Sequence, residues 1–232
     1  MAKIKNILKY CFIFLILFIM LFSLTGCYDA RGLETLSYVV AIGIDIGENN
    51  LLRLSLQFAT TSASGEGSAQ YTDTTITTVE CSTLSSGINL INSYISKQIY
   101  LAHCKIIVIS ENLAARGVSE YISTLKNNVE IRPDCSILIS RCSAEDFLNS
   151  SSPGLETLAA RYYDLIFNSI SYTGFSPNVT LFSFFSALED KYCHPVAILS
   201  GITSESTQKV SPTTAFTDID GSYKARRNTN KK

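Results

Sequence analysis

The sequence predicts an α+β fold in which a mixed β-sheet packs with helices in one main domain. Continuous apolar, β-branched segments such as Ser37–Ile46 and Cys104–Ser110 are typical of buried strands. Between them, Leu84–Ile95 has apolar residues at three- and four-residue steps, which predicts a helix with one face on a core. The chain has 232 residues and is 46% hydrophobic, so it can bury a core of domain size.

The first two strands are expected to form a hairpin. Ser37–Ile46 should be buried on both faces, whereas Leu51–Ala59 alternates apolar with polar residues and should be half exposed. Gly47–Asn50 between them is a turn-forming segment. Thr60–Tyr71 is rich in Ser and Gly and predicts a mobile loop, after which Thr74–Glu80 predicts a third strand.

The next elements alternate between helix and strand. After the helix come the strand Cys104–Ser110, a helical segment Glu111–Asn127 that breaks near Gly117, and the strand Asp134–Arg141. The residues expected on the core face of the first helix are Leu84, Ile88, Ile91, Tyr94 and Ile95.

Three helices are predicted in the region that follows. Ser143 with Asp146 three residues later resembles a capping box that opens a short helix. A longer helix should cover Leu155–Ser169, and another should begin with Ser176 as N-cap and Pro177 at the first helical position. The residues that this last helix should turn inward are Leu181, Phe184, Phe185 and Leu188.

The pattern of the main domain ends with Pro195–Ile202, a candidate for the last strand. From Thr203 the sequence becomes polar and its end is basic, so residues 203–232 should form a poorly ordered tail. The main domain is thus expected to cover residues 27–202.

The N-terminal residues 1–26 have the features of a signal peptide. Three bases, Lys3, Lys5 and Lys9, precede the apolar run Cys11–Leu24. This run is fourteen residues long, whereas a spanning helix needs about twenty apolar residues. The run therefore indicates a signal sequence rather than a permanent membrane span.

The four residues Leu24, Thr25, Gly26 and Cys27 indicate lipidation. A signal peptidase needs small residues beside the bond that it cleaves, and Cys27 supplies the thiol to which diacylglycerol is joined. We expect cleavage between Gly26 and Cys27, with the acyl chains, at about 0.8 kcal/mol per buried methylene, holding the chain on the extracytoplasmic face of the cell membrane. The alternatives are an ordinary secretory signal followed by a chance cysteine, or an uncleaved anchor.

The charge balance argues against a nucleic-acid partner. Residues 1–26 contain three lysines and no acid, so the remaining chain has 16 basic and 20 acidic side chains and a net charge of −4. A nucleic-acid-binding surface requires the opposite sign.

The five remaining cysteines, Cys81, Cys104, Cys135, Cys142 and Cys193, show no CxxC spacing, so no metal site is expected. Cys104 and Cys135 lie in apolar runs and should be small buried hydrophobes. An extracytoplasmic location permits a disulfide, but the spacing does not choose its partners.

The side chains that could support catalysis are few. His103 and Cys104 are neighbours on a predicted strand edge and should point to opposite faces, and His194 precedes Pro195 in a predicted turn. The adjacent acids Glu145–Asp146 and Glu189–Asp190 should splay apart on solvated helix faces. No Gly-rich phosphate-binding motif is present. The sequence therefore predicts no enzyme, no catalytic or metal site, and no cofactor except the diacylglycerol on Cys27.

Two stretches of sequence resemble the Ger(x)C family, the lipoprotein C subunits of spore nutrient-germinant receptors. The opening stretch is Gly26-Cys27-Tyr28-Asp29 with Arg31 and Leu33, followed by Val39–Asp45. The second comprises Lys97–His103, the strand to Ser110, Leu113–Gly117 and Glu130–Arg132. Tyr28 replaces the usual Trp, and Gly32 stands where an acid is common. The resemblance covers Cys27 to about Ile202, which is the first of the three domains of this family.

This resemblance implies a partner and a location. The chain would be tethered at the outer face of the inner spore membrane, where it would assist integral A and B subunits in nutrient-triggered germination by scaffolding or signal relay. The alternative function is a solute-binding lipoprotein of a transporter, and a third is an envelope hydrolase. The single predicted domain and the absence of Trp argue against a hinged solute-binding cleft.

Overall fold

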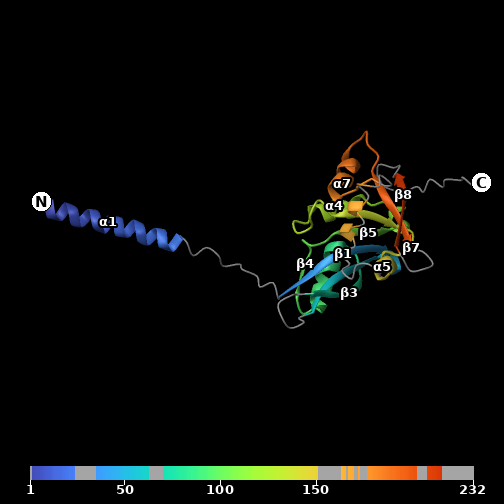
Figure 1. Cartoon of the computed structure of the whole chain (residues 1–232), viewed down its shortest axis with the longest axis horizontal. Helices are drawn as coiled ribbons and strands as arrows, with labels where there is room; N and C mark the ends of the chain where they lie inside the picture. The colour runs from blue at the N-terminus through green and yellow to red at the C-terminus, as the bar shows by residue number, and fades with distance from the viewer. Residues whose placement is uncertain are drawn as a thin grey trace, which may run out of the picture. The chain divides into compact units, whose positions relative to one another are not determined.

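The computed structural model describes residues 2–23, 35–62, 70–150, 163–165, 167–169, 172, 177–202 and 208–215 (Figure 1). It consists of two units, Met1–Thr35 and Leu36–Lys232. The first contains the helix α1 (Ala2–Ser23), which includes most of the apolar run expected in a signal peptide. No helix among the described residues is long and apolar enough to cross a membrane.

The second unit is built on one mixed sheet, which confirms the predicted α+β class. Within the described residues the sheet has eight strands in the order β3-β2-β1-β5-β6-β7-β8, and the short β4 also pairs with β1. Strands β1, β4, β5, β6 and β7 run parallel to their neighbours in this group, while β2, β3 and β8 are joined antiparallel. The bounds are β1 (Leu36–Ile46), β2 (Leu52–Ser62), β3 (Gln70–Cys81), β4 (Gln98–Tyr100), β5 (Ile106–Ser110), β6 (Ser136–Ser140), β7 (Val196–Ile202) and β8 (Gln208–Ala215).

The hairpin β1–β2 forms as predicted, with a 3-10 turn over Glu48–Asn50. Strands β2 and β3 extend to Ser62 and from Gln70, so the loop predicted for Thr60–Tyr71 is wrong at both ends; residues 63–69 lie outside the described part. Backbone pairing between the two strands continues into this polar segment and satisfies its N–H and C=O groups.

Strand β2 is buried on both faces, contrary to the expected half exposure. Its polar residues Ser55 and Gln57 are both fully buried. The Tyr163 hydroxyl donates to Gln57 Oε1 at 3.2 Å, so a side chain distant in the sequence covers the face that the alternation assigns to solvent. Strand β1 is buried on both faces, as expected.

One face of the sheet carries the larger core. It is covered by α2 (Leu84–Tyr94), α3 (Glu111–Ala114), α4 (Ser119–Asn127) and α7 (Leu181–Glu189). The break expected near Gly117 lies between α3 and α4. Tyr94 was expected to face this core but is 68% exposed. The core-facing side of α2 includes Ile91 and continues to Ile95, the residue after the helix. Tyr94 lies at the edge of this side.

The opposite face is covered by α5 (Ala144–Asn149) and by Tyr163 and Phe167. These two aromatic residues are buried four positions apart in helical segments 163–165 and 167–169. The remainder of the helix predicted for Leu155–Ser169 lies outside the described residues. Helix α5 begins as predicted, because Ser143 Oγ accepts from the Asp146 backbone N–H at 3.0 Å.

Helix α7 begins later than predicted. Its N-cap is Thr180, which forms a reciprocal capping box with Ser183, and Pro177 is not helical. The residues just before the helix follow β6, because the Ile137 N–H donates to Val179 O at 3.0 Å. Backbone pairing with the sheet therefore overrides the Ser-Pro helix-start signal, and Ser176 lies outside the described residues.

The segment after Thr203 contains a strand that the composition does not predict. Strand β8 pairs antiparallel with β7 from Val196↔Ala215 to Ile202↔Gln208. It gives partners to the edge of β7 that faces away from β6, which explains how a polar segment joins the sheet.

Candidate functional site

A row of buried polar side chains crosses the sheet where four parallel strands end. Asp45, Ser110, Ser140 and Ser200 lie near the carboxyl ends of β1, β5, β6 and β7, and each is at most 4% exposed. Ser110 pairs with Ser140 and Ser140 with Ser200, while Asp45 follows the last paired residue of β1. Residues in register on parallel strands point to the same face, so these four side chains, the polar row, share the face that α5 covers. Ligands of open α/β sheets commonly bind at this end.

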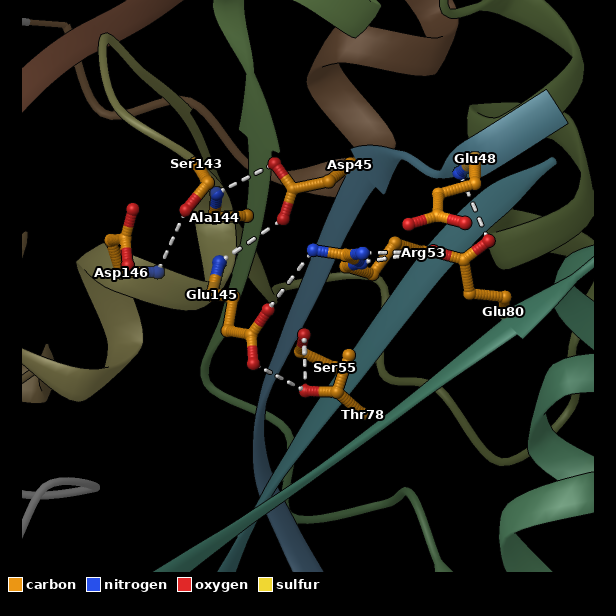
Figure 2. Close-up of polar contacts among 10 residues, drawn as sticks. All are labelled: Asp45, Glu48, Arg53, Ser55, Thr78, Glu80, Ser143, Ala144, Glu145 and Asp146. Carbon is orange, nitrogen blue, oxygen red and sulfur yellow. Dashed lines mark hydrogen bonds and ion pairs between the residues drawn. The ribbon is translucent and has the colours of Figure 1, made fainter. Parts of the chain in front are cut away.

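Asp45 joins β1 to the start of α5 (Figure 2). Its carboxylate oxygens accept from the Ala144 N–H at 2.7 Å and from the Glu145 N–H at 3.1 Å. The first backbone N–H groups of a helix have no partner within the helix, so the carboxylate satisfies donors that would otherwise be buried unpaired. Asp45 thus acts as a cap from a strand about a hundred residues earlier in the chain.

A glycine allows this close approach. A Cβ atom at Gly43 would lie 3.0 Å from Leu148 Cδ1 and 3.2 Å from Ala144 Cβ. Most side chains at this position would push α5 away from β1 and lengthen the two hydrogen bonds to Asp45.

The charge state of Asp45 reflects competing effects. Burial raises the pKa of the Asp45 carboxyl above its usual value, while the hydrogen bonds from the Ala144 and Glu145 backbone and the proximity of the Ser110 hydroxyl oppose this increase. The Ser110 hydroxyl is near enough to affect this pKa but makes no hydrogen bond of good geometry among the described residues. Within the described residues, the row therefore contains a buried carboxylate that accepts two backbone hydrogen bonds and a buried hydroxyl that makes none.

Arg53 forms a second connection around α5, visible beside Asp45 in Figure 2. Its guanidinium lies 2.9 Å from Glu80 Oε1 and 3.7 Å from Glu145 Oε2. Thr78 Oγ1 donates to Glu145 Oε1 at 3.1 Å, and the Glu48 N–H donates to Glu80 Oε2 at 2.9 Å. This Arg53 bridge ties α5 to the hairpin turn and to β3. The prediction that Glu145 lies on a purely solvated face is wrong, because its carboxylate contacts Arg53 and Thr78 on the sheet.

Among the described residues, the polar row and the Arg53 bridge contain no paired serine and histidine. A serine nucleophile needs an adjacent base, and both histidines, His103 and His194, are exposed elsewhere. No group of three or more metal-ligating side chains occurs among the described residues. The arrangement holds a short helix against the ends of the strands, which is a structural function.

A second candidate site is a cavity of about 460 Å³ near the starts of β5 and β6. Its charged side chains are already paired. Lys105 lies 3.1 Å from Asp164, and Arg132 forms a two-pronged contact with Asp134 at 3.0 and 2.6 Å. The lining residues are Tyr100, Ala102, His103, Cys104, Lys105, Arg132, Asp134, Cys135, Ser136, Asp164, Phe167, Asn168, Asn178 and Thr180.

The prediction that His103 lies on a strand edge beside Cys104 is wrong. His103 lies in a turn rather than on a strand, and its ring packs on those of Tyr38 and Tyr100 with centroids 5.0 and 5.7 Å away. Cys104 is buried beside Cys135, as its apolar setting predicted.

The residues expected to carry the lipid are not described. Leu24, Thr25, Gly26 and Cys27 all lie outside the described residues, so their role stays a prediction. The polar row and the Arg53 bridge were not predicted. Asp45 ends an apolar strand and Ser143 begins a helix, but nothing in the sequence pairs the two.

The comparisons with known proteins found similarity to spore germination proteins. The family model of the spore germination protein N-terminal domain matches residues 29–202. Spore germination protein KC of Bacillus subtilis (strain 168) is 23% identical over 150 residues, which are 62% of this chain and 37% of that protein. The putative spore germination protein YfkR of the same strain is 26% identical over 133 residues, 55% of this chain and 34% of that protein.

The chain thus spans about a third of the length of the curated relatives it matches. A solved structure, that of the GerBC protein, aligns with a TM-score of 0.38 and 11% identity over 78% of this chain and 50% of that one.

Proposed function

Because the chain belongs to the spore germination protein family whose N-terminal domain it matches, we propose that it is a membrane-anchored lipoprotein subunit of a spore nutrient-germinant receptor. The family match over residues 29–202 carries this proposal. Spore germination is the process named for both curated relatives.

The proposed anchor is the diacylglycerol on Cys27. The lysines, the short apolar run and the small residue before Cys27 support it. Attachment would place the domain on the outer face of the inner spore membrane. There it would lie beside the integral A and B subunits. Attachment to the same membrane would raise the effective concentration of the domain at these subunits, even without an additional protein contact.

We propose scaffolding or signal relay rather than catalysis as the mechanism. Asp45 and the Arg53 bridge hold α5 and the hairpin in place, and the charges of the cavity are paired with each other. A domain of this kind offers a fixed surface to its partners.

The test is a deletion in the spore-forming host, complemented with the wild-type chain, with Cys27→Ala or with Cys193→Ala. Cys193 is exposed in the folded domain and is the matched control. We expect nutrient-triggered germination to be lost on deletion and restored by the wild-type and Cys193→Ala chains only. The Cys27→Ala chain should also leave the membrane fraction.

Two results would count against the proposal. Normal nutrient germination in the deletion strain would remove the receptor role, and a Cys27→Ala chain that stayed fully in the membrane fraction would remove the lipid anchor. Isolation of the tagged wild-type chain from detergent extracts should recover integral membrane subunits with it.

The solute-binding alternative has one observation in its favour, the cavity of about 460 Å³, which is large enough for a small molecule. A solute that bound there would raise the melting temperature with its concentration. A thermal shift by a defined nutrient that required Lys105 and Arg132 would favour this alternative.

A further inference from the structure

Two cysteines, 31 residues apart in the sequence, meet beside the sheet. The Cys135 thiol donates to Cys104 Sγ at 3.5 Å. A disulfide places its sulfur atoms about 2.05 Å apart, so disulfide formation requires the two sulfurs to move closer together. The backbones are already side by side, because the Ser136 N–H donates to Lys105 O at 2.9 Å and β5 pairs with β6 from Ile106↔Ser136.

We propose that Cys104 and Cys135 form a disulfide after export, which joins the segments that lead into β5 and β6. The oxidising location rests on the proposed function, whereas the choice of partners rests on the geometry.

The chemistry is a thiol–disulfide exchange with a small-molecule or protein disulfide. One cysteine thiolate attacks the oxidant and releases one thiol, and the second cysteine then displaces the other. Two protein thiols are thereby oxidised to one disulfide, and the oxidant is reduced to two thiols that take up the two protons.

The other described cysteines are placed differently. Cys142 Sγ contacts Ser140 Oγ at 3.1 Å, Cys193 is exposed, and Cys81 is buried in β3. Within the described residues, no other two cysteine sulfurs are in contact. The structure thus selects one pair where the sequence left the pairing open.

The cavity of about 460 Å³ gives the oxidant a route, because both Cys104 and Cys135 line it. Burial raises the pKa of the Cys135 thiol well above its usual value, and Lys105 opposes this only in part. Since the thiolate is the reacting form, oxidation of the folded domain should be slow and should go fastest during folding.

The experiment maps the cysteines of the full chain before and after it is unfolded in urea and refolded in detergent with oxidised glutathione at pH 8. Free thiols are blocked with N-ethylmaleimide, and the chain is cut with trypsin without reduction. We expect the peptides Gln98–Lys105 and Asn127–Arg141 to appear joined, at the sum of their masses less two hydrogens. Each peptide holds one cysteine. The second peptide runs past Arg132 because trypsin does not cleave between Arg132 and Pro133.

The variants Cys104→Ser and Cys135→Ser should each abolish the joined species, and Cys193→Ser should leave it. Oxidation should also raise the melting temperature by roughly 5–10 °C. The wild-type map decides the question even if a serine variant fails to fold.

Membranes from spores, blocked with the same reagent during lysis, provide the native measurement, in which the joined peptides are again expected. Separate maleimide-labelled peptides after oxidation, a link to a different cysteine, or a reduced pair in native membranes would each overturn the proposal. The map does not depend on germination, so its failure is distinguishable from failure of the receptor role.

Discussion

Replacement of Gly87 by alanine should destabilise the domain even though it improves the helix. Gly87 lies inside α2, where Gly→Ala ordinarily gains about 1 kcal/mol of helix propensity. Here the new Cβ atom would lie 2.6 Å from Cys81 Sγ and 2.8 Å from Leu54 Cδ2. Both neighbours are buried, at 6% and 1% exposure, so neither can move freely.

Overpacking of a well-filled core costs about 1–3 kcal/mol, and two contacts this short place Gly87→Ala in the upper part of that range. After the gain in propensity, we expect a net loss of about 1–2 kcal/mol, or a fall in melting temperature of about 2–8 °C. Asn89→Ala is the matched control, because Asn89 is on the exposed face of the same helix and its replacement should stabilise by a few tenths of a kcal/mol.

Urea unfolding followed by far-ultraviolet circular dichroism in constant detergent measures these changes. A double-mutant cycle with Cys81→Ala isolates the cause, since removal of the sulfur should reduce the cost of Gly87→Ala by about 0.5–1 kcal/mol. A Gly87→Ala chain as stable as Asn89→Ala would refute the close packing of α2 against β2 and β3. A double-mutant cycle that showed no coupling between Gly87→Ala and Cys81→Ala would refute it too.

The remaining predictions concern the acid and the cap that position α5 and α7. Because burial raises the pKa of Asp45, the folded state holds this proton more tightly than the unfolded state, and stability falls as the pH rises from 3.8 through the folded-state pKa. Asp45→Asn should lack this fall, so the stability difference between the two chains should change over that interval in urea titrations; a constant difference would contradict the assignment. Thr180→Ala removes the hydroxyl that accepts from the Ser183 N–H at 3.2 Å and should cost about 1 kcal/mol, whereas Thr180→Ser should cost little. Equal stability of the Thr180→Ala and wild-type chains in the same assay would place the N-cap elsewhere.

The elements that the sequence predicts well are those whose signal is local. The apolar runs of β1, β5, β6 and β7 and the periodicity of α2 reflect burial by their immediate partners. The N-cap Ser143 is likewise found from four consecutive residues, because its hydrogen bond is made within one turn.

The incorrect predictions arise where a segment distant in the sequence changes the surroundings of a residue. Ser55 and Gln57 alternate with apolar residues as on an exposed strand, but α5 and Tyr163 cover that face. Thr180 replaces Ser176 as the cap because residues 177–180 follow β6. Strand β8 exists because β7 offers it backbone partners. In each instance, tertiary pairing outweighs local propensity.

The polar row is hard to predict for the same reason. Asp45 at the end of an apolar strand could be an ordinary exposed terminus, and its meaning appears only when the N–H groups of Ala144 and Glu145 lie within 2.7 and 3.1 Å. The Cys104–Cys135 contact is similar, since the register of β5 and β6 brings the two thiols together.

The position of β1 links the proposed anchor to the core. Cys27 and Leu36 are nine residues apart, and a chain spans at most about 3.3–3.6 Å per residue, so a lipid on Cys27 would keep the start of β1 within about 30 Å of its own attachment point. Strand β1 pairs with β2 on one side and with β4 and β5 on the other, and its end holds α5 through Asp45. A tether at this strand would therefore act on the centre of the sheet, and a load applied there would reach α5 through Asp45. This path through the sheet supports the proposed scaffolding or signal relay.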